Sequence, residues 1–147
     1  IDEGNTLKEK LNIAVHCIDF MKKLKKTPKI ATLSYARPGD YGRSEEINQS
    51  LDDAKKLTQL IEKHTNQKIE NSCVLIDQAI KNKCNILIAP NGIVGNTIFR
   101  TLVLLNSWPS FGAITFGIDD IYIDTSRDQS REGYLRSLEL AYKLAKL

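Results

Sequence analysis

Three polar loops, two of which contain glycine, hold most of the residues in this sequence that could bind an anion. Each loop follows an apolar segment that is typical of a strand. Guanidinium groups, hydroxyls and free backbone N–H groups all donate hydrogen bonds to phosphate or carboxylate oxygens. The candidate ligand-binding residues are Arg37, Asp40, Arg43 and Ser44 in the first loop, Asn91, Gly92, Gly95 and Asn96 in the second, and Ser126, Arg127, Ser130 and Arg131 in the third.

The same loops also have a purely structural interpretation. Gly39 and Gly42 can be turn residues, Asn91-Gly92 a tight turn, and Ser130 a helix cap. For any one of these loops taken alone, we favour this structural interpretation over a ligand-binding one. Because all three loops are expected at one edge of a sheet, we favour a site for a small anionic ligand.

Other kinds of active site have no motif in this sequence. There is no GxxxxGK[ST] loop, no GxGxxG after the first expected strand, and no HExxH or GxSxG. The three cysteines are far apart and form no CxxC pair, which predicts free thiols in a reducing cytoplasm. We therefore expect no metal site.

Apolar periodicity predicts the helices and strands that must position the loops. Thr6 and Glu9 form a capping box ahead of the first helix, and Ser72 is a candidate cap for a short third helix. Helices are expected over about 6–26, 50–64, after 72, after 96 and over 130–145, and strands over 29–34, 85–89, 113–116 and 121–123.

This order predicts an α/β fold with a three-layer αβα arrangement. The longer strands are continuous apolar runs, as in a mostly parallel sheet that is covered on both faces. Ligands of such sheets bind outside the carboxyl ends of the strands, where the polar loops are expected.

Composition is that of an ordinary globular domain. The chain has 147 residues, 41% of them hydrophobic and 27% charged, with a net charge of +3. This small positive excess does not favour nucleic acid, and the absence of a long apolar run excludes a transmembrane helix. We expect a single cytoplasmic α/β domain over residues 1–147 that binds neither nucleic acid nor membrane. The chain begins with Ile1 and its only methionine is Met21, which suggests part of a longer protein.

Two segments resemble a known family. Residues 85–96, N-I-L-I-A-P-N-G-I-V-G-N, resemble the phosphate acetyl/butyryltransferase family, in which a strand ends in a Pro-Asp-x-x-x-Gly-Asn loop. Residues 124–127, D-T-S-R, resemble the Ser-Arg signature of that family. Within the superfamily, residues 37–44 and 50–54 resemble the methanogenesis marker protein 4 group, named putative methyltransferase subunit X in methanogenic archaea.

The resemblance implies an isocitrate/isopropylmalate dehydrogenase-like fold of two α/β segments with the site in the cleft between them. Acyltransferases of the family pass an acyl group between phosphate and coenzyme A, so coenzyme A is a candidate substrate and no other cofactor is expected. Ser126 and Arg127 match the pair that holds the phosphoryl group. Glu132 is a near match to the aspartate that helps deprotonate the thiol, and Asn91 replaces the usual aspartate of the loop. The chain would then be the C-terminal part of a larger two-segment protein.

Three hypotheses about function remain open at this point. The first is a transferase-like protein that binds an acyl phosphate, phosphate or coenzyme-A-type ligand, with Arg127, Ser126 and Glu132 as catalytic residues. The second is a methyltransferase or its accessory subunit, and the third is a non-catalytic ligand sensor or partner-binding domain. As partners we expect a second copy in a homodimer or a methyltransferase complex, with the Trp108–Phe111 stretch either at an interface or in a buried turn.

Overall fold

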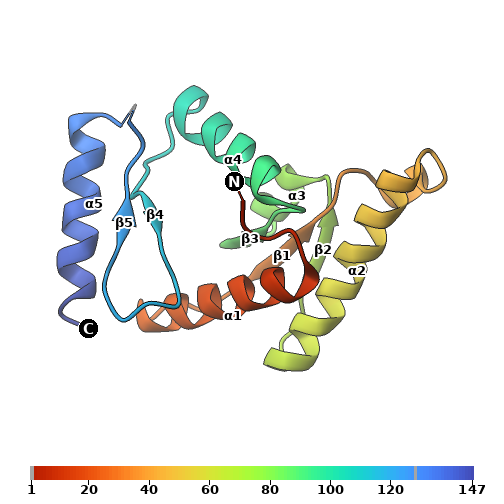
Figure 1. The fold of residues 1–147 in the computed structure, drawn as a ribbon, viewed down its shortest axis with the longest axis horizontal. Helices are drawn as coiled ribbons and strands as arrows, with labels where there is room; N and C mark the ends of the chain where they lie inside the picture. Colours follow the sequence, from red (N-terminus) through yellow and green to blue (C-terminus); the bar gives the residue numbers. More distant parts are fainter. Residues whose placement is uncertain (1, 128) are drawn as a thin grey trace. The chain divides into compact units, whose positions relative to one another are not determined.

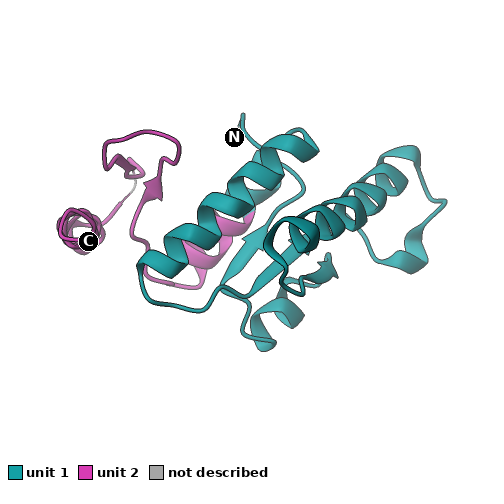
Figure 2. Cartoon of the chain, turned by 90° about the horizontal axis from the view of Figure 1, so that it is seen from below, with its two compact units in different colours: residues 1–97 teal, residues 98–147 magenta. Residues whose placement is uncertain are grey.

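The computed structural model describes residues 2–127 and 129–147. Asp128, in the third polar loop, and Ile1 lie outside the described residues. The chain divides into two compact units, Ile1–Thr97 and Ile98–Leu147 (Figure 2).

Unit 1 contains a three-stranded parallel sheet in the order β2-β1-β3 (Figure 1). The central strand, β1 (Ile30–Leu33), is buried along its whole length, between β2 (Glu70–Cys73) and β3 (Ile86–Ile88). Because the strands are parallel, their carboxyl ends lie at the same edge. The parallel α/β character predicted from the sequence is confirmed for this unit.

Two long helices pack against each other and against the sheet. The first, α1 (Leu7–Lys23), contacts β3, and α2 (Glu45–Thr65) contacts β1 and β2. A short helix, α3 (Ile76–Lys81), lies against β2. Apolar side chains from these helices and the strands form one buried core: Ala14, Ile18, Ile30, Leu57, Ile61, Ile69, Ile86 and Ile88.

The predicted start of α2 was wrong. Ser44, not Ser50, is the N-cap, and its Oγ accepts a hydrogen bond from the Ile47 N–H at 3.2 Å. Glu45 and Glu46 in the first turn suit the positive end of the helix dipole. Ile47 is the one apolar residue of this first turn, so the periodicity becomes clear only from Leu51 and placed the start too late.

The strand β2 was missed, and Ser72 is not a helix cap. Ser72 lies inside β2 and is buried, and α3 begins only at Ile76, with Leu75 at the N-cap. The strand reads Glu-Asn-Ser-Cys, without the apolar run by which the other two strands were recognised. Its backbone pairing with β1 makes it a strand.

Unit 2 is built around a two-stranded antiparallel pair. It begins within α4 (Gly92–Arg100), which leads into a π-helical turn, Thr101–Leu105. The strands β4 (Ala113–Ile114) and β5 (Ile123–Asp124) pair with each other, and α5 (Arg131–Leu144) follows. The sequence predicted a single mostly parallel sheet. Here the two short strands form a separate antiparallel sheet.

Candidate functional site

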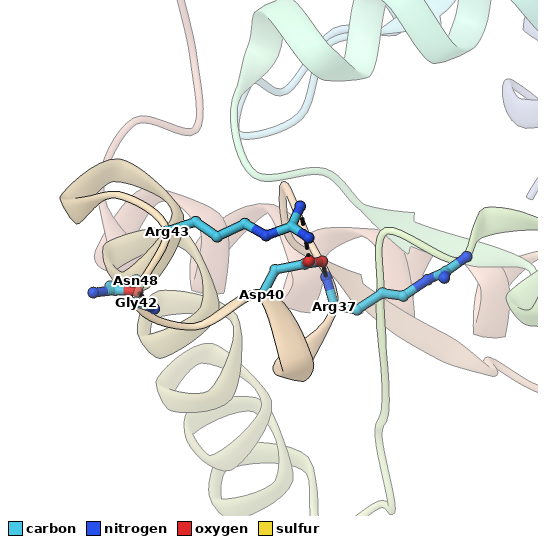
Figure 3. Close-up of polar contacts among 5 residues, drawn as sticks. All are labelled: Arg37, Asp40, Gly42, Arg43 and Asn48. Carbon is cyan, nitrogen blue, oxygen red and sulfur yellow. Dashed lines mark hydrogen bonds and ion pairs between the residues drawn. The ribbon is translucent and has the colours of Figure 1, made fainter.

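The first polar loop leaves the carboxyl end of β1 and is organised around the Asp40 carboxylate. One carboxylate oxygen accepts a hydrogen bond from the Arg37 N–H at 3.0 Å, and the other forms an ion pair with Arg43 Nη1 at 3.0 Å (Figure 3). The Arg43 side chain is 72% exposed. Exposed ion pairs of this kind contribute little to stability, so Arg43 can exchange this partner for a ligand at small cost.

Two further residues of this loop have structural roles. Gly42 has φ +96°, where a side chain would be strained, and its N–H donates to Asn48 Oδ1 at 2.6 Å. Ser44 caps α2. The Arg37 guanidinium is different, because it extends away from Asp40 and Arg43 (Figure 3) and forms no ion pair with another described residue. Arg37 therefore presents the most available cation of the loop.

The second loop leaves the carboxyl end of β3, at the same edge of the sheet. Asn91 is the residue that shapes it: Asn91 Oδ1 accepts from the Val94 N–H at 2.9 Å, and Asn91 Nδ2 donates to Tyr35 Oη at 2.6 Å. The amide thus caps the start of α4 and ties it to the segment after β1. Gly92 and Gly95 lie in the first turns of α4, and Asn96 is exposed.

A cavity of about 230 Å³ opens at this edge, within unit 1. It is lined from β1 and the segment after it, from α1 and α2, and from the turn after β3; among its lining residues are Lys10, Leu33, Tyr35, Asp53, Pro90 and Asn91. Lys10 is only 6% exposed, and its Nζ donates to the Pro90 carbonyl oxygen at 2.9 Å.

Lys10 was not among the residues singled out from the sequence. A signal for it was present, because Lys10 lies three residues after Leu7 and four before Ala14, on the apolar stripe of the first helix. A lysine at a core-facing position requires a polar partner.

The third loop belongs to unit 2 and follows β5. The Ser126 carbonyl oxygen accepts hydrogen bonds from the Gln129 N–H at 3.0 Å and Tyr134 Oη at 3.4 Å. Arg127 is exposed. Ser130 caps α5 by accepting from the Gly133 N–H at 3.1 Å, and Arg131 and Glu132 are the first two residues of that helix, both exposed. Because β5 pairs with β4 and not with β1 or β3, the common sheet edge is established for the first two loops only.

The structural interpretation therefore describes several candidates correctly: Asp40, Ser44, Asn91 and Ser130 each hold their own loop or helix end. Direct contact of the candidate residues with a ligand stays a prediction. The side chains with the greatest freedom to meet an anion are Arg37, Arg43, Arg127 and Arg131, all of them exposed.

A second polar cluster surrounds Glu70 in β2. Glu70 accepts hydrogen bonds from Ser72 Oγ at 2.6 Å and from Asn82 Nδ2 at 3.0 Å. The Ser72 hydrogen bond is the main reason why the pKa of Glu70 lies below its usual range. Cys84 Sγ also donates to Glu70, and partial burial together with this carboxylate raises the pKa of the Cys84 thiol. This network stabilises a carboxylate and suppresses a thiolate, which is the opposite of what a nucleophilic cysteine needs.

The cysteines are free, and burial raises the pKa of Cys17 to about 11. Within residues 2–127 and 129–147, no group of three or more His, Cys, Asp or Glu side chains is placed to hold a metal ion. In the same part of the chain, no helix combines the length and hydropathy needed to cross a membrane.

Solved structures identify the class of fold. The chain superposes on the EutD phosphotransacetylase of Staphylococcus aureus with a TM-score of 0.67 and 20% identity, covering 97% of this chain and 48% of that one. For a phosphotransacetylase of Streptococcus pyogenes the TM-score is 0.68 at 22% identity, over 100% and 48% of the two chains. For a branched-chain phosphotransacylase of Enterococcus faecalis V583 it is 0.69 at 21% identity, over 97% and 55%. The chain thus has an α/β fold similar to that of the phosphotransacylases.

Comparison with curated sequences identifies homologues of this chain. The chain is 37% identical over 128 residues to the "putative methyltransferase mtx subunit X" of Methanosarcina mazei, which is 86% of this chain and 45% of that protein. It is 32% identical over 139 residues to an "uncharacterized methyltransferase" of Methanocaldococcus jannaschii, 94% of this chain and 56% of that protein. The chain is a homologue of the mtx subunit X proteins of Methanosarcina species, and the resemblance predicted from the sequence is confirmed. It spans about half the length of the curated relatives it matches. No family model matches the chain.

Proposed function

We propose that this chain is a phosphotransacylase-like transferase domain that binds an acyl phosphate, phosphate or coenzyme-A-type ligand through Ser126 and Arg127. The observation that supports it most directly is the geometry of the third loop. Two hydrogen bonds hold the Ser126 carbonyl, while the next side chain, Arg127, is exposed and forms no ion pair with another described residue. A guanidinium on an anchored loop can donate two parallel hydrogen bonds to a phosphoryl group.

The chemistry that such a pair would serve is acyl transfer between phosphate and a thiol. The sulfur forms a bond to the acyl carbon, the bond between that carbon and the phosphate oxygen breaks, and the thiol proton goes to a base. Arg127 would neutralise the negative charge that develops on the leaving phosphate. Glu132, exposed in the first turn of α5, is the proposed base for the thiol proton.

The loops of unit 1 carry cations of their own for an anionic ligand. Arg37 and Arg43 lie at the carboxyl edge of the parallel sheet, where ligands of α/β proteins bind. Asp40 and Asn91 then act indirectly, by fixing the loops from which the cations and the α4 backbone are presented.

Isothermal titration calorimetry with coenzyme A and with acetyl phosphate tests the proposal. The variant Arg127→Ala is expected to weaken binding of at least one of these ligands about tenfold or more, because it removes a charge-assisted hydrogen bond. Lys55→Ala, which removes an exposed cation from α2, serves as the matched control and should bind as wild type does. Failure of the wild-type chain to bind either ligand, or unchanged affinity of Arg127→Ala, would contradict the proposal.

A second candidate function is membership in a methyltransferase complex, which the names of the Methanosarcina relatives favour. Affinity capture with the tagged chain, followed by mass spectrometric identification of a methyltransferase partner, tests it. Methyl turnover by the chain alone would make it a methyltransferase in its own right. Coenzyme A binding without turnover of acyl phosphate would favour a ligand-sensing role.

A further inference from the structure

Lys10 is a buried ammonium group whose hydrogen-bonding capacity is only partly used. Its side chain enters the cavity of unit 1 from α1, with 6% of the residue exposed. Of its three N–H donors, one reaches the Pro90 carbonyl oxygen at 2.9 Å. Among residues 2–127 and 129–147, no carboxylate forms an ion pair with it within 4.0 Å. A buried charge with unused donors is costly unless another acceptor faces it.

The cavity is the space in which that acceptor would lie. It lies at the carboxyl edge of β1 and β3, and its volume of about 230 Å³ has room for a small organic molecule. Its polar lining on the α2 side includes the carboxylates of Asp53 and Glu46. Asp53 Oδ1 accepts from Gln49 Nε2 at 2.7 Å, which leaves Oδ2 to accept from a ligand.

The charges around the cavity select among possible anions. Lys10 contributes one positive charge, and Asp53 and Glu46 two negative charges. A doubly charged phosphate would be repelled by the two carboxylates more strongly than a singly charged carboxylate would. A hydroxyl group on the ligand could in turn donate to Asp53.

We propose that this cavity is a binding site for a small hydroxycarboxylate, with Lys10 donating to the ligand's carboxylate and Asp53 accepting from its hydroxyl group. This inference goes beyond the proposed transferase function. It rests on Lys10 and Asp53, which that function does not use, and it involves no phosphate ester and no residue of unit 2.

Titration of the full chain with three small probes, followed by amide NMR shifts, tests the proposal. The probes are glycolate, acetate, which lacks the hydroxyl group, and inorganic phosphate. Glycolate is expected to shift the amide signals of Tyr35, Ser50 and Asn91, with a Kd at least threefold lower than that of acetate. Phosphate is expected to bind more weakly than either. Binding of phosphate alone would overturn the carboxylate assignment, and the absence of shifts with all three probes would mean that only water fills the cavity.

Two variants and a control assign the binding to its residues. Lys10→Met should weaken glycolate and acetate binding at least tenfold, whereas Lys8→Met, on the exposed face of the same helix, should leave both unchanged. Asp53→Asn keeps Lys10 and should abolish the preference for glycolate over acetate. If Lys10→Met does not fold, Asp53→Asn still tests the proposal. A preference of Asp53→Asn for glycolate over acetate equal to that of wild type would overturn it. These outcomes are independent of the Arg127→Ala result, so each proposal can fail alone.

Discussion

Lys10 and Pro90 are 80 positions apart in the chain, yet Lys10 Nζ donates a 2.9 Å hydrogen bond to the Pro90 carbonyl oxygen. This contact connects the first helix to the turn that follows β3, immediately before Asn91. The neighbouring hydrogen bond from Asn91 Nδ2 to Tyr35 Oη connects the same turn to the segment after β1. The carboxyl edge of the parallel sheet is therefore held by side chains from separate parts of the sequence.

The Asn91 amide is expected to stabilise unit 1 through both of its ends. Asn91→Ala removes the helix cap and the Tyr35 contact, and should lower the free energy of unfolding by about 1–3 kcal/mol. Urea unfolding followed by circular dichroism measures this. In a cycle with Tyr35→Phe, the double variant should lose less than the sum of the two single variants. Strict additivity would mean that the Asn91–Tyr35 hydrogen bond contributes nothing.

Ser44 and Ser50 are expected to stabilise the protein in different ways. Ser44→Ala removes the cap of α2 and should cost about 1 kcal/mol, whereas Ser44→Asp should retain most of the stability. Ser50→Ala instead leaves the Tyr35 N–H without its acceptor, at a cost of about 1–3 kcal/mol. Thermal and urea unfolding test both. A neutral Ser44→Ala would show that α2 does not begin where the structure places it.

The two arginines of the first loop should differ in their importance for anion binding. Arg43 forms an ion pair with Asp40, and Arg37 forms no ion pair with a described residue. Arg37→Ala is therefore expected to weaken coenzyme A or acetyl phosphate binding more than Arg43→Ala does, by about threefold or more in calorimetry. Asp40→Asn releases Arg43 and provides the comparison. Equal, unchanged affinities in the two alanine variants would mean that this loop does not bind these anions.

The Glu70 network predicts a pH dependence of stability. The pKa of Glu70 is lowered in the folded protein, chiefly by the Ser72 hydrogen bond, so folding favours the ionised carboxylate. The ionised Glu70 carboxylate contributes its full stabilisation of the folded state above the ordinary glutamate pKa of about 4.3. This stabilisation is lost as the pH falls through the lower pKa that Glu70 has in the folded protein. The difference in urea midpoint between wild type and Glu70→Gln should therefore be larger at pH 7 than at pH 3. A difference that is constant over this range would contradict the assignment.

Cys17 should resist alkylation until the protein unfolds. Burial raises its pKa to about 11, whereas a free thiol ionises near pH 8.5. At pH 8 the thiolate fraction is then lower by about two orders of magnitude in the folded state than in the unfolded state. Iodoacetamide labelling with peptide mass spectrometry, with and without urea, measures the ratio. Equal labelling rates in the two states would show that Cys17 is accessible and ionised.

Short-range signals in the sequence predicted much of the secondary structure. The capping box of Thr6 and Glu9 is present at the start of α1, and Ser130 caps α5 as its position before the helical pattern suggested. The apolar runs around Ile30 and Ile86 are parallel strands. These features depend on residues a few positions apart, whose side chains meet as soon as the local backbone forms.

What the sequence determined by itself is therefore the α/β class, the caps of α1 and α5, the polar loops and the resemblance to its archaeal relatives. Only the tertiary structure decided that Glu70–Cys73 is a strand, because its pairing with β1 outweighs a polar composition. Only the tertiary structure showed that the buried Lys10 ammonium group has a hydrogen-bond acceptor, because that acceptor, the Pro90 carbonyl oxygen, comes from the other end of unit 1. Backbone pairing and the burial of a charge are set by contacts across long stretches of chain, and local periodicity does not record them.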